Sequence, residues 1–113
     1  MSFDIIVLRP SNPDAESLDS VRDANDLGDL ASVRRGFDSI FPGATTGVFL
    51  HNEEYALEVS LAGDPVGSAH IALRFGAAWS DASHDQFVER LGELCRRLQC
   101  VAFAVSDNAR LGP

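Results

Sequence analysis

The sequence predicts an α+β fold in a single domain spanning residues 1–113. Five segments show the β-branched or alternating apolar pattern of strands, and two others place apolar side chains at the spacing of a helix. Three of the strands follow one another with only short loops between them, which favours antiparallel pairing. The element order is therefore β-α-β-β-β-α-β, and we expect a mostly antiparallel five-stranded sheet with two helices on one face.

The first strand is expected over residues 3–9, which read FDIIVLR and end before Pro10, a residue without a backbone donor. Its apolar side chains occupy both faces, as is typical of an interior strand covered on both sides. Residues 10–29 are then rich in acidic and turn-forming side chains and contain few apolar positions. We expect an acidic loop there, with at most one or two helical turns between residues 15 and 24.

The first helix is expected over residues 30–41. Asp29 is a suitable N-cap, apolar side chains recur along one stripe, and a proline-glycine pair at residues 42–43 ends the segment. Gly36 lies inside this helix and costs about 1 kcal/mol of helix propensity relative to alanine. We therefore expect its small size to serve close packing against a strand.

An antiparallel meander of three strands follows, over residues 47–51, 54–61 and 67–75. The odd-numbered positions of the second and third of these strands are apolar, and we expect them to face the helices. Gly63 and Pro65 occupy turn positions in the loop between the two strands. This alternation leaves the even-numbered positions on the opposite, partly open face of the sheet.

The side chains on that open face follow from the register of the hairpins. Pairing across the loop between the last two strands of the meander places Glu58 opposite His70. The same register places Glu54 opposite Arg74. A two-residue turn at residues 52–53 would bring two aromatic side chains of the preceding strand to this face as well. The open face is then expected to carry Phe49, His51, Glu54, Glu58, His70 and Arg74.

The second helix is expected over residues 83–98, where apolar side chains form a broad stripe. Either Ser83 or Asp81 would cap its N-terminus. The final strand is expected over residues 100–106, and the polar tail of residues 107–113 is expected to be frayed.

The charge balance limits the classes of partner. The chain carries 17 acidic and 9 basic residues, a net charge of -8, and its sequence pI is about 4.6. Such a surface repels nucleic acids and anionic membranes and favours a basic partner protein. The sequence contains neither a long apolar run nor a signal-peptide pattern, so we expect a cytoplasmic protein.

The acidic residues are concentrated in one part of the chain. Residues 14–29 contain six acids against Arg22, a local net charge of -5. A solvated loop accounts for this pattern, and so does a docking surface for a basic protein. The five acids of this segment counted as candidate binding residues are Asp14, Glu16, Asp19, Asp23 and Asp26.

Patterns for catalysis and for metal binding are weak in this sequence. Ser68 and His70 are same-face neighbours on a strand, and no nucleophile elbow surrounds them. The histidines lack the spacing of metal ligands, and the glycines form no phosphate-binding loop. We therefore expect no enzyme activity, no catalytic residue, no metal and no cofactor. A small enzyme using His51, Glu58 and His70 is the catalytic alternative.

The two cysteines and the single tryptophan are the remaining side chains with a possible functional role. Cys95 and Cys100 lack the spacing of a zinc or redox motif, and we interpret them as small core residues kept as thiols. Trp79 is the only tryptophan and lies in a loop. A loop tryptophan folds back over the core or, when exposed, anchors an interface. We count Trp79 and the neighbouring Asp81 among the candidate partner-binding residues.

Short motifs spread along the chain form a pattern of their own. Residues 3–4 read FD before an apolar pair, residues 27–28 read LG ahead of Val33, and residues 41–43 read FPG. Together they resemble a family of small bacterial proteins linked to polymorphic-toxin systems. The chain departs from that pattern in two loops, where the stretch after FPG is shortened to ATT and the loop after the fourth strand reads GAAWSDAS.

The resemblance implies an immunity protein with an antitoxin-like role. Such a toxin inhibitor binds the toxic domain of a cognate effector through a protein-protein interaction and occludes its active site without turnover. An acidic inhibitor suits an effector with a basic cleft, because it mimics the charge of the substrate. The alternative is a structural homo-oligomer that buries the open sheet face, with Phe49, Ala56 and Ala72 at the contact.

Overall fold

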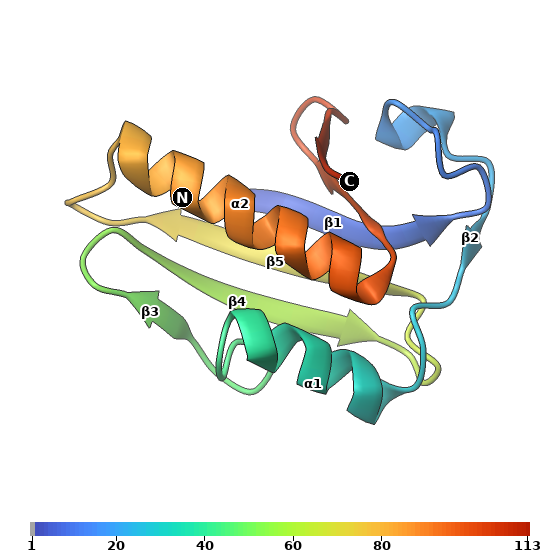
Figure 1. The fold of residues 1–113 in the computed structure, drawn as a ribbon, viewed down its shortest axis with the longest axis horizontal. Coiled ribbons are helices and arrows are strands. Elements are labelled where there is room, and N and C mark those ends of the chain that lie inside the picture. Colours follow the sequence, from blue (N-terminus) through green and yellow to red (C-terminus); the bar gives the residue numbers. More distant parts are fainter. Residues whose placement is uncertain (1) are drawn as a thin grey trace.

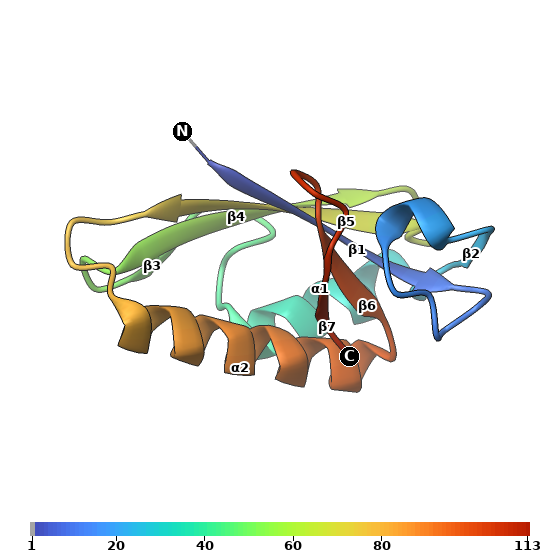
Figure 2. The same cartoon turned by 90° about the horizontal axis from the view of Figure 1, so that it is seen from above.

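Two helices cover one face of an antiparallel sheet, as Figures 1 and 2 show for the computed structural model, which describes residues 2–113. Within these residues the sheet has seven strands, six of them in the order β3-β4-β5-β1-β6-β7, with β2 paired to β1. The strands are β1 (Phe3–Pro10), β2 (Ala24–Asn25), β3 (Phe49–His51), β4 (Tyr55–Ala62), β5 (Ser68–Phe75), β6 (Val101–Ala104) and β7 (Arg110–Gly112). The helices are α1 (Leu30–Ile40), α2 (Asp81–Leu98) and the short 3-10 helix η1 (Leu18–Ser20). The α+β class with two helices on one face is confirmed, whereas the count of five strands is wrong because β2 and β7 extend the sheet.

Strand β1 is the interior strand that its apolar pattern predicts. It pairs antiparallel with β5 on one side and with β6 on the other. Ile5 and Val7 are fully buried in the core between the sheet and the helices. Leu8 faces the other way and belongs to a second, smaller core cluster. Apolar residues at both parities are therefore explained by two separate cores.

Helix α1 begins and ends close to where the sequence predicts. The Asp29 carboxylate accepts the backbone N–H of Ser32 at 3.1 Å, and hydrogen bonding from Ser32 lowers the pKa of Asp29. Gly36 contacts the other helix and not a strand, which corrects the prediction. A Cβ atom added there would lie 2.6 Å from the Cδ2 atom of Leu98, near the end of α2.

The hairpin of β4 and β5 has a register two residues away from the expected one. Leu61 pairs with Ala69 rather than with Gly67, so Ser60 and not Glu58 lies opposite His70. A shift of two residues preserves the alternation of faces. The odd-numbered side chains of both strands therefore face the helices, as predicted.

The hairpin of β3 and β4 differs by one residue in turn length, and this changes a face. His51 pairs with Tyr55, so the turn spans residues 52–54 instead of two residues. A one-residue slip moves every side chain of a strand to the other face. Phe49 and His51 consequently lie on the side of the helices, and Leu50 takes the place on the open face.

Helix α2 begins two residues earlier than expected. Ser80 is its N-cap and accepts the backbone N–H of Ser83 at 3.3 Å, while Asp81 lies in the first turn. The prediction of Ser83 or Asp81 as the cap is therefore wrong. The sequence offers a serine at both residues 80 and 83, and only the first has the extended backbone that a cap requires.

The C-terminal segment is ordered rather than frayed. Strand β6 ends at Ala104, and the chain then turns back so that β7 pairs with β6. Ala104 donates its backbone N–H to the carbonyl oxygen of Ala109 at 2.8 Å. Residues 107–113 thus extend the sheet, which corrects the expectation of a frayed tail.

Candidate functional site

The segment of residues 14–29, called the acidic segment below, presents its carboxylates to solvent. Every one of its acidic side chains is exposed, whereas its apolar residues Ala15 and Leu27 are buried. Its net charge of -5 is thus on the surface. The exposed acids are Asp14, Glu16, Asp19, Asp23, Asp26 and Asp29.

The acidic segment is packed onto the sheet, which the sequence did not indicate. Leu18 and Val21 lie against Leu8, Val101 and Phe103 on the face of the sheet away from the helices. The blue η1 helix stands over that end of the sheet in Figure 2. Two partly buried apolar side chains are too few to predict a helix, but they suffice to hold this loop on a preformed surface.

Backbone hydrogen bonds tie residues 23–25 of the acidic segment to the end of β1 and to the residue that follows it. Ser11 donates its N–H to the carbonyl oxygen of Asp23 at 2.8 Å, and β2 pairs with Arg9 and Pro10. Two residues are not enough to carry a strand pattern, so β2 was outside what the sequence could predict.

The C-terminal segment completes the support of the acidic segment. Leu18 donates its N–H to the carbonyl oxygen of Asn108 at 2.8 Å. The Nη1 atom of Arg110 donates to the carbonyl oxygens of Pro13 and Ala15 at 2.8 and 2.7 Å. A loop and a tail that each looked mobile in the sequence therefore hold one another in place.

The open face of the sheet carries two polar side-chain pairs, one of a histidine with an aspartate and one of an arginine with a glutamate. His70 Nε2 lies 3.2 Å from Asp4 Oδ1, and Arg74 Nη2 donates to Glu58 Oε1 at 3.2 Å. All four side chains are between 43% and 46% exposed, so each pair contributes little to stability. The predicted pairs of Glu58 with His70 and of Glu54 with Arg74 are replaced by these two, because the register is shifted. Glu54 precedes β4 and, instead of joining the open face, accepts a hydrogen bond from α2.

The sheet separates the residues of the catalytic alternative. His51 is on the helix side, whereas Glu58 and His70 are on the open face. Phe49, expected on the open face, packs against Phe41 with 5.6 Å between ring centroids. The set of His51, Glu58 and His70 therefore does not form one site.

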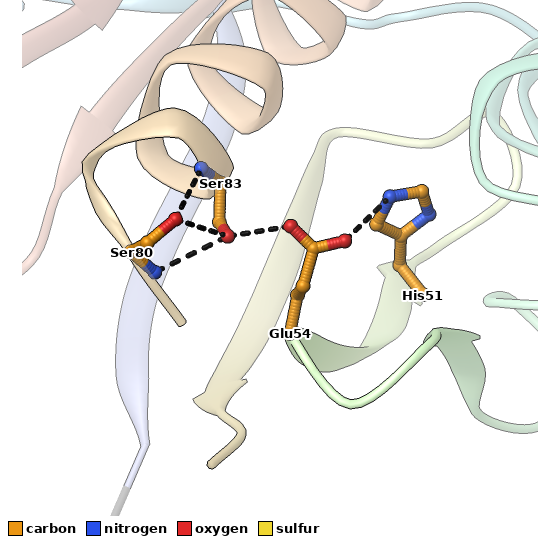
Figure 3. A network of polar contacts seen from close by, with 4 residues as sticks. All are labelled: His51, Glu54, Ser80 and Ser83. Carbon is orange, nitrogen blue, oxygen red and sulfur yellow. Dashed lines mark hydrogen bonds and ion pairs between the residues drawn. The ribbon is translucent and has the colours of Figure 1, made fainter. Parts of the chain in front are cut away.

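A polar network joins the β3–β4 turn to the start of α2 (Figure 3). The buried Ser83 hydroxyl donates to Glu54 Oε1 at 2.6 Å, and His51 Nε2 lies 3.3 Å from Glu54 Oε2. The Ser83 hydrogen bond is the main cause that lowers the pKa of Glu54. Ser80 contributes the second serine of the network through reciprocal contacts with Ser83.

This network differs from a catalytic triad in its order. In a triad the histidine lies between the nucleophile and the acid, so that it can take the proton from the hydroxyl. Here the Glu54 carboxylate lies between Ser83 and His51, and the Ser83 side chain has no exposed surface. The arrangement fits a structural link between a turn and a helix cap.

Trp79 folds back over the core and is partly buried. Its ring contacts Phe75 at 4.7 Å and meets Tyr55 edge-on at 5.8 Å between centroids. Tyr55 is itself only 2% exposed, and burial raises the pKa of its phenol. Of the two possibilities for a loop tryptophan, the structure therefore has the one in which the ring covers the core. Asp81 is exposed at the start of α2.

Beside Trp79 the structure contains an apolar hollow that no sequence pattern indicated. It has a volume of about 200 Å³ and lies between the end of β5 and the first half of α2. Its walls include Leu73 and Phe75 of β5 and Val88 and Leu91 of α2. Phe75 is 51% exposed and Val88 is 36% exposed, although both belong to stripes expected to face the core.

Cys95 and Cys100 are both buried and unbridged. The backbone N–H of Cys100 donates to the carbonyl oxygen of Cys95 at 2.9 Å, so the two residues lie across the C-terminal end of α2. A hydrogen bond from Cys100 lowers the pKa of the Cys95 thiol, and the same contact raises the pKa of Cys100. Their burial agrees with a place in the core.

Between residues 2 and 113 no group of three or more histidine, cysteine, aspartate or glutamate side chains is placed to hold a metal ion. None of the helices in this range is long and apolar enough to cross a membrane. No family model matches the chain, and no curated protein or solved structure is significantly similar to it.

Proposed function

We propose that this protein is a non-catalytic inhibitor that binds a basic partner protein and occludes its active site, as toxin-immunity proteins do. The observation that carries the proposal is the acidic segment, whose exposed carboxylates stand on a backbone held by β1 and by the C-terminal segment. A surface that is already ordered loses little conformational entropy on binding. Charge complementarity then raises the association rate and the specificity.

The partner that fits this surface is a cognate bacterial effector with a basic active-site cleft, met in the cytoplasm. Two arguments support this choice. The motifs at residues 3–4, 27–28 and 41–43 resemble those of immunity-like proteins. The local charge of -5 in the acidic segment is complementary to a cleft that binds an anionic substrate.

Co-expression with the product of the adjacent gene tests the proposal. We expect that product to arrest growth when expressed alone and to be harmless when this protein is present. The charge-neutralised variant with Asp19, Asp23 and Asp26 changed to asparagine should protect less well. A variant with Glu53, Glu89 and Glu93 changed to glutamine alters the net charge equally and should protect as well as the native chain.

Two outcomes contradict the proposal. The adjacent product is harmless alone, or it stays toxic in the presence of the native chain. A loss of protection that is equal in the two charge variants would instead exclude the acidic segment as the contact, because only total charge would then matter.

The alternative is a homo-oligomeric module that buries the open face of the sheet. Leu50 favours it, because this side chain is 70% exposed on that face, where Ala56 and Ala72 are also found. The two polar side-chain pairs on the same face disfavour it, since burying them costs desolvation energy. A molar mass that rises with concentration in light scattering would support the oligomer.

A further inference from the structure

We propose that the apolar hollow beside Trp79 binds one aromatic side chain of the partner, taken from a segment in which basic residues flank that side chain. The inference rests on the proposed function in one respect, that the partner is basic. It concerns a surface apart from the acidic segment. In Figure 1 the first half of α2 and the end of β5 lie at the opposite end of the molecule from η1 and β2.

The hollow has the size and the lining for an aromatic ring. Its volume of about 200 Å³ exceeds the roughly 150 Å³ of an engineered apolar cavity that binds benzene. Four aromatic side chains belong to its lining. An aromatic ring bound in the hollow would pair with them edge-to-face or in offset stacks, which are the favourable arrangements of aromatic rings. These aromatic side chains are Phe3, Phe75, Trp79 and Phe87.

The hollow is also open where a partner would approach. Phe75 and Val88 on its walls are 51% and 36% exposed, so apolar surface is left in water. The centroid of the Phe75 ring lies 4.7 Å from that of Trp79 and 6.4 Å from that of Phe3, so the ring is packed beside two other aromatic side chains. An incoming side chain would remove this apolar surface from water without requiring a large rearrangement.

Acidic side chains of α2 stand next to this apolar surface. Asp81 lies three residues before His84, and Asp85 lies three residues before Val88, so each carboxylate is on the same side of α2 as a residue of the lining. The Asp85 carboxylate is 83% exposed, and Asp81 is exposed as well. Arginine or lysine on either side of the aromatic residue would meet these carboxylates.

The same charges argue against a second copy of this chain as the occupant. Each copy has a net charge of -8 and carries the same two carboxylates beside its hollow. In a symmetric dimer the same patch of both copies meets, which would bring like charges together. A basic segment of a different protein is the occupant that the rim favours.

Titration with three short capped peptides tests this site directly. The peptides are Arg-Arg-Phe-Arg-Arg, Arg-Arg-Ala-Arg-Arg and Gly-Gly-Phe-Gly-Gly, and none contains tryptophan. Trp79 is the only tryptophan of the protein, so its emission reports binding at the hollow. We expect the first peptide to bind at least about tenfold more tightly than the second, because it buries a phenylalanine ring.

Matched variants separate the hollow from general charge effects. Val88→Gln should weaken binding of the first peptide, whereas Val105→Gln, at another exposed valine, should leave it unchanged. Changing both Asp81 and Asp85 to asparagine should weaken binding more than the same change at Asp19 and Asp23, two exposed acids of the acidic segment at the other end of the molecule.

Several outcomes would overturn the proposal. Equal binding of the phenylalanine and alanine peptides would exclude the hollow, and equal binding of the glycine-flanked peptide would exclude the acidic rim. A Trp79 signal that changes with protein concentration alone would identify a second copy as the occupant. Protection in co-expression without any peptide binding would remove only this inference, while peptide binding without protection would remove only the proposed function.

Discussion

Ser83 is a fully buried polar side chain that joins α2 to the β3–β4 turn. It takes part in the capping box with Ser80 and donates to the Glu54 carboxylate. Serine is a favoured N-cap residue, so Ser80 ahead of an apolar stripe is compatible with a helix start. The contact with Glu54 was beyond prediction, because it joins residues 29 positions apart in the chain.

Ser83→Ala should reduce the free energy of unfolding by about 1 kcal/mol, the usual cost of losing a hydrogen bond and part of a helix cap. Urea unfolding at neutral pH measures this change. Ser60→Ala, at an exposed serine of β4, serves as the control and should leave the midpoint unchanged. Equal midpoints for the two variants would show that the network does not stabilise the fold.

The Glu54 carboxylate makes the free energy of unfolding depend on pH. Its pKa in the folded protein is lowered from 4.5, chiefly by the Ser83 hydrogen bond. A carboxylate with a lowered folded pKa stabilises the protein above its unfolded pKa, and the contribution is lost as the pH falls through the folded pKa.

Glu54→Gln should therefore lose less stability than the native chain when the pH is lowered from neutral to about 3, which is below the reference pKa of glutamate. Urea midpoints at the two pH values measure the difference. Glu89→Gln, at an exposed glutamate of α2, should keep the pH dependence of the native chain. The same loss in Glu54→Gln as in the native chain would contradict the role of this carboxylate.

Among the elements, two connections pack against each other at one end of the sheet, namely the β3–β4 turn and the loop between β5 and α2. The loop after β5 lies against the β3–β4 turn, since Gly76 donates its N–H to Glu54 and Ala78 donates to Glu53 at 2.9 and 3.0 Å. A Cβ atom at Gly76 would clash with the backbone carbonyl oxygen of Glu53. Only glycine allows this approach of two backbones.

Gly76→Ala should destabilise the protein by about 1–3 kcal/mol, the range for overpacking, and should shift the emission of Trp79, which follows in the same loop. Gly47→Ala is the control, because its Cβ would approach no atom closer than 3.7 Å. Thermal unfolding followed by fluorescence measures both effects. If the two variants behave alike, the close approach at Gly76 does not constrain this loop.

Arg110 makes the acidic segment and the C-terminal segment one unit. Arg110→Ala removes the donors to Pro13 and Ala15, and we expect faster amide hydrogen exchange in residues 11–23 with no change in α1. Arg96→Ala, at an exposed arginine of α2, should leave exchange in that region as it is. Unchanged exchange in Arg110→Ala would show that other contacts suffice to hold the segment.

The elements that the sequence predicted well are those with long apolar patterns. Strand β4 alternates over eight residues, and both helices carry apolar stripes, so their facing side chains could be assigned in advance. The face of β3 was assigned wrongly because its three residues take their register from the length of the turn alone. Strands β2 and β7 were missed because they have only two and three residues, which is too short to show the alternation of apolar and polar side chains.

At the scale of the whole molecule, the acidic segment and the apolar hollow are surfaces of different origin. The charge of the acidic segment comes from residues of one continuous stretch of chain, so it could be located from the sequence. The second is assembled from β1, β5, α2 and β7, and no single stretch of chain contains it. Its partly exposed aromatic lining could be recognised only once these elements were placed together.

The acidic segment of the folded protein is the proposed docking surface for a basic partner. Its most direct test is the association rate with the product of the adjacent gene, measured by stopped flow from low to high ionic strength. We predict that changing Asp19, Asp23 and Asp26 to asparagine slows association at least about tenfold at low salt, and that the difference disappears at about 1 M salt, where the screening length is near 3 Å. The same rate and the same salt dependence for the native chain and this variant would show that the acidic segment is not the docking surface.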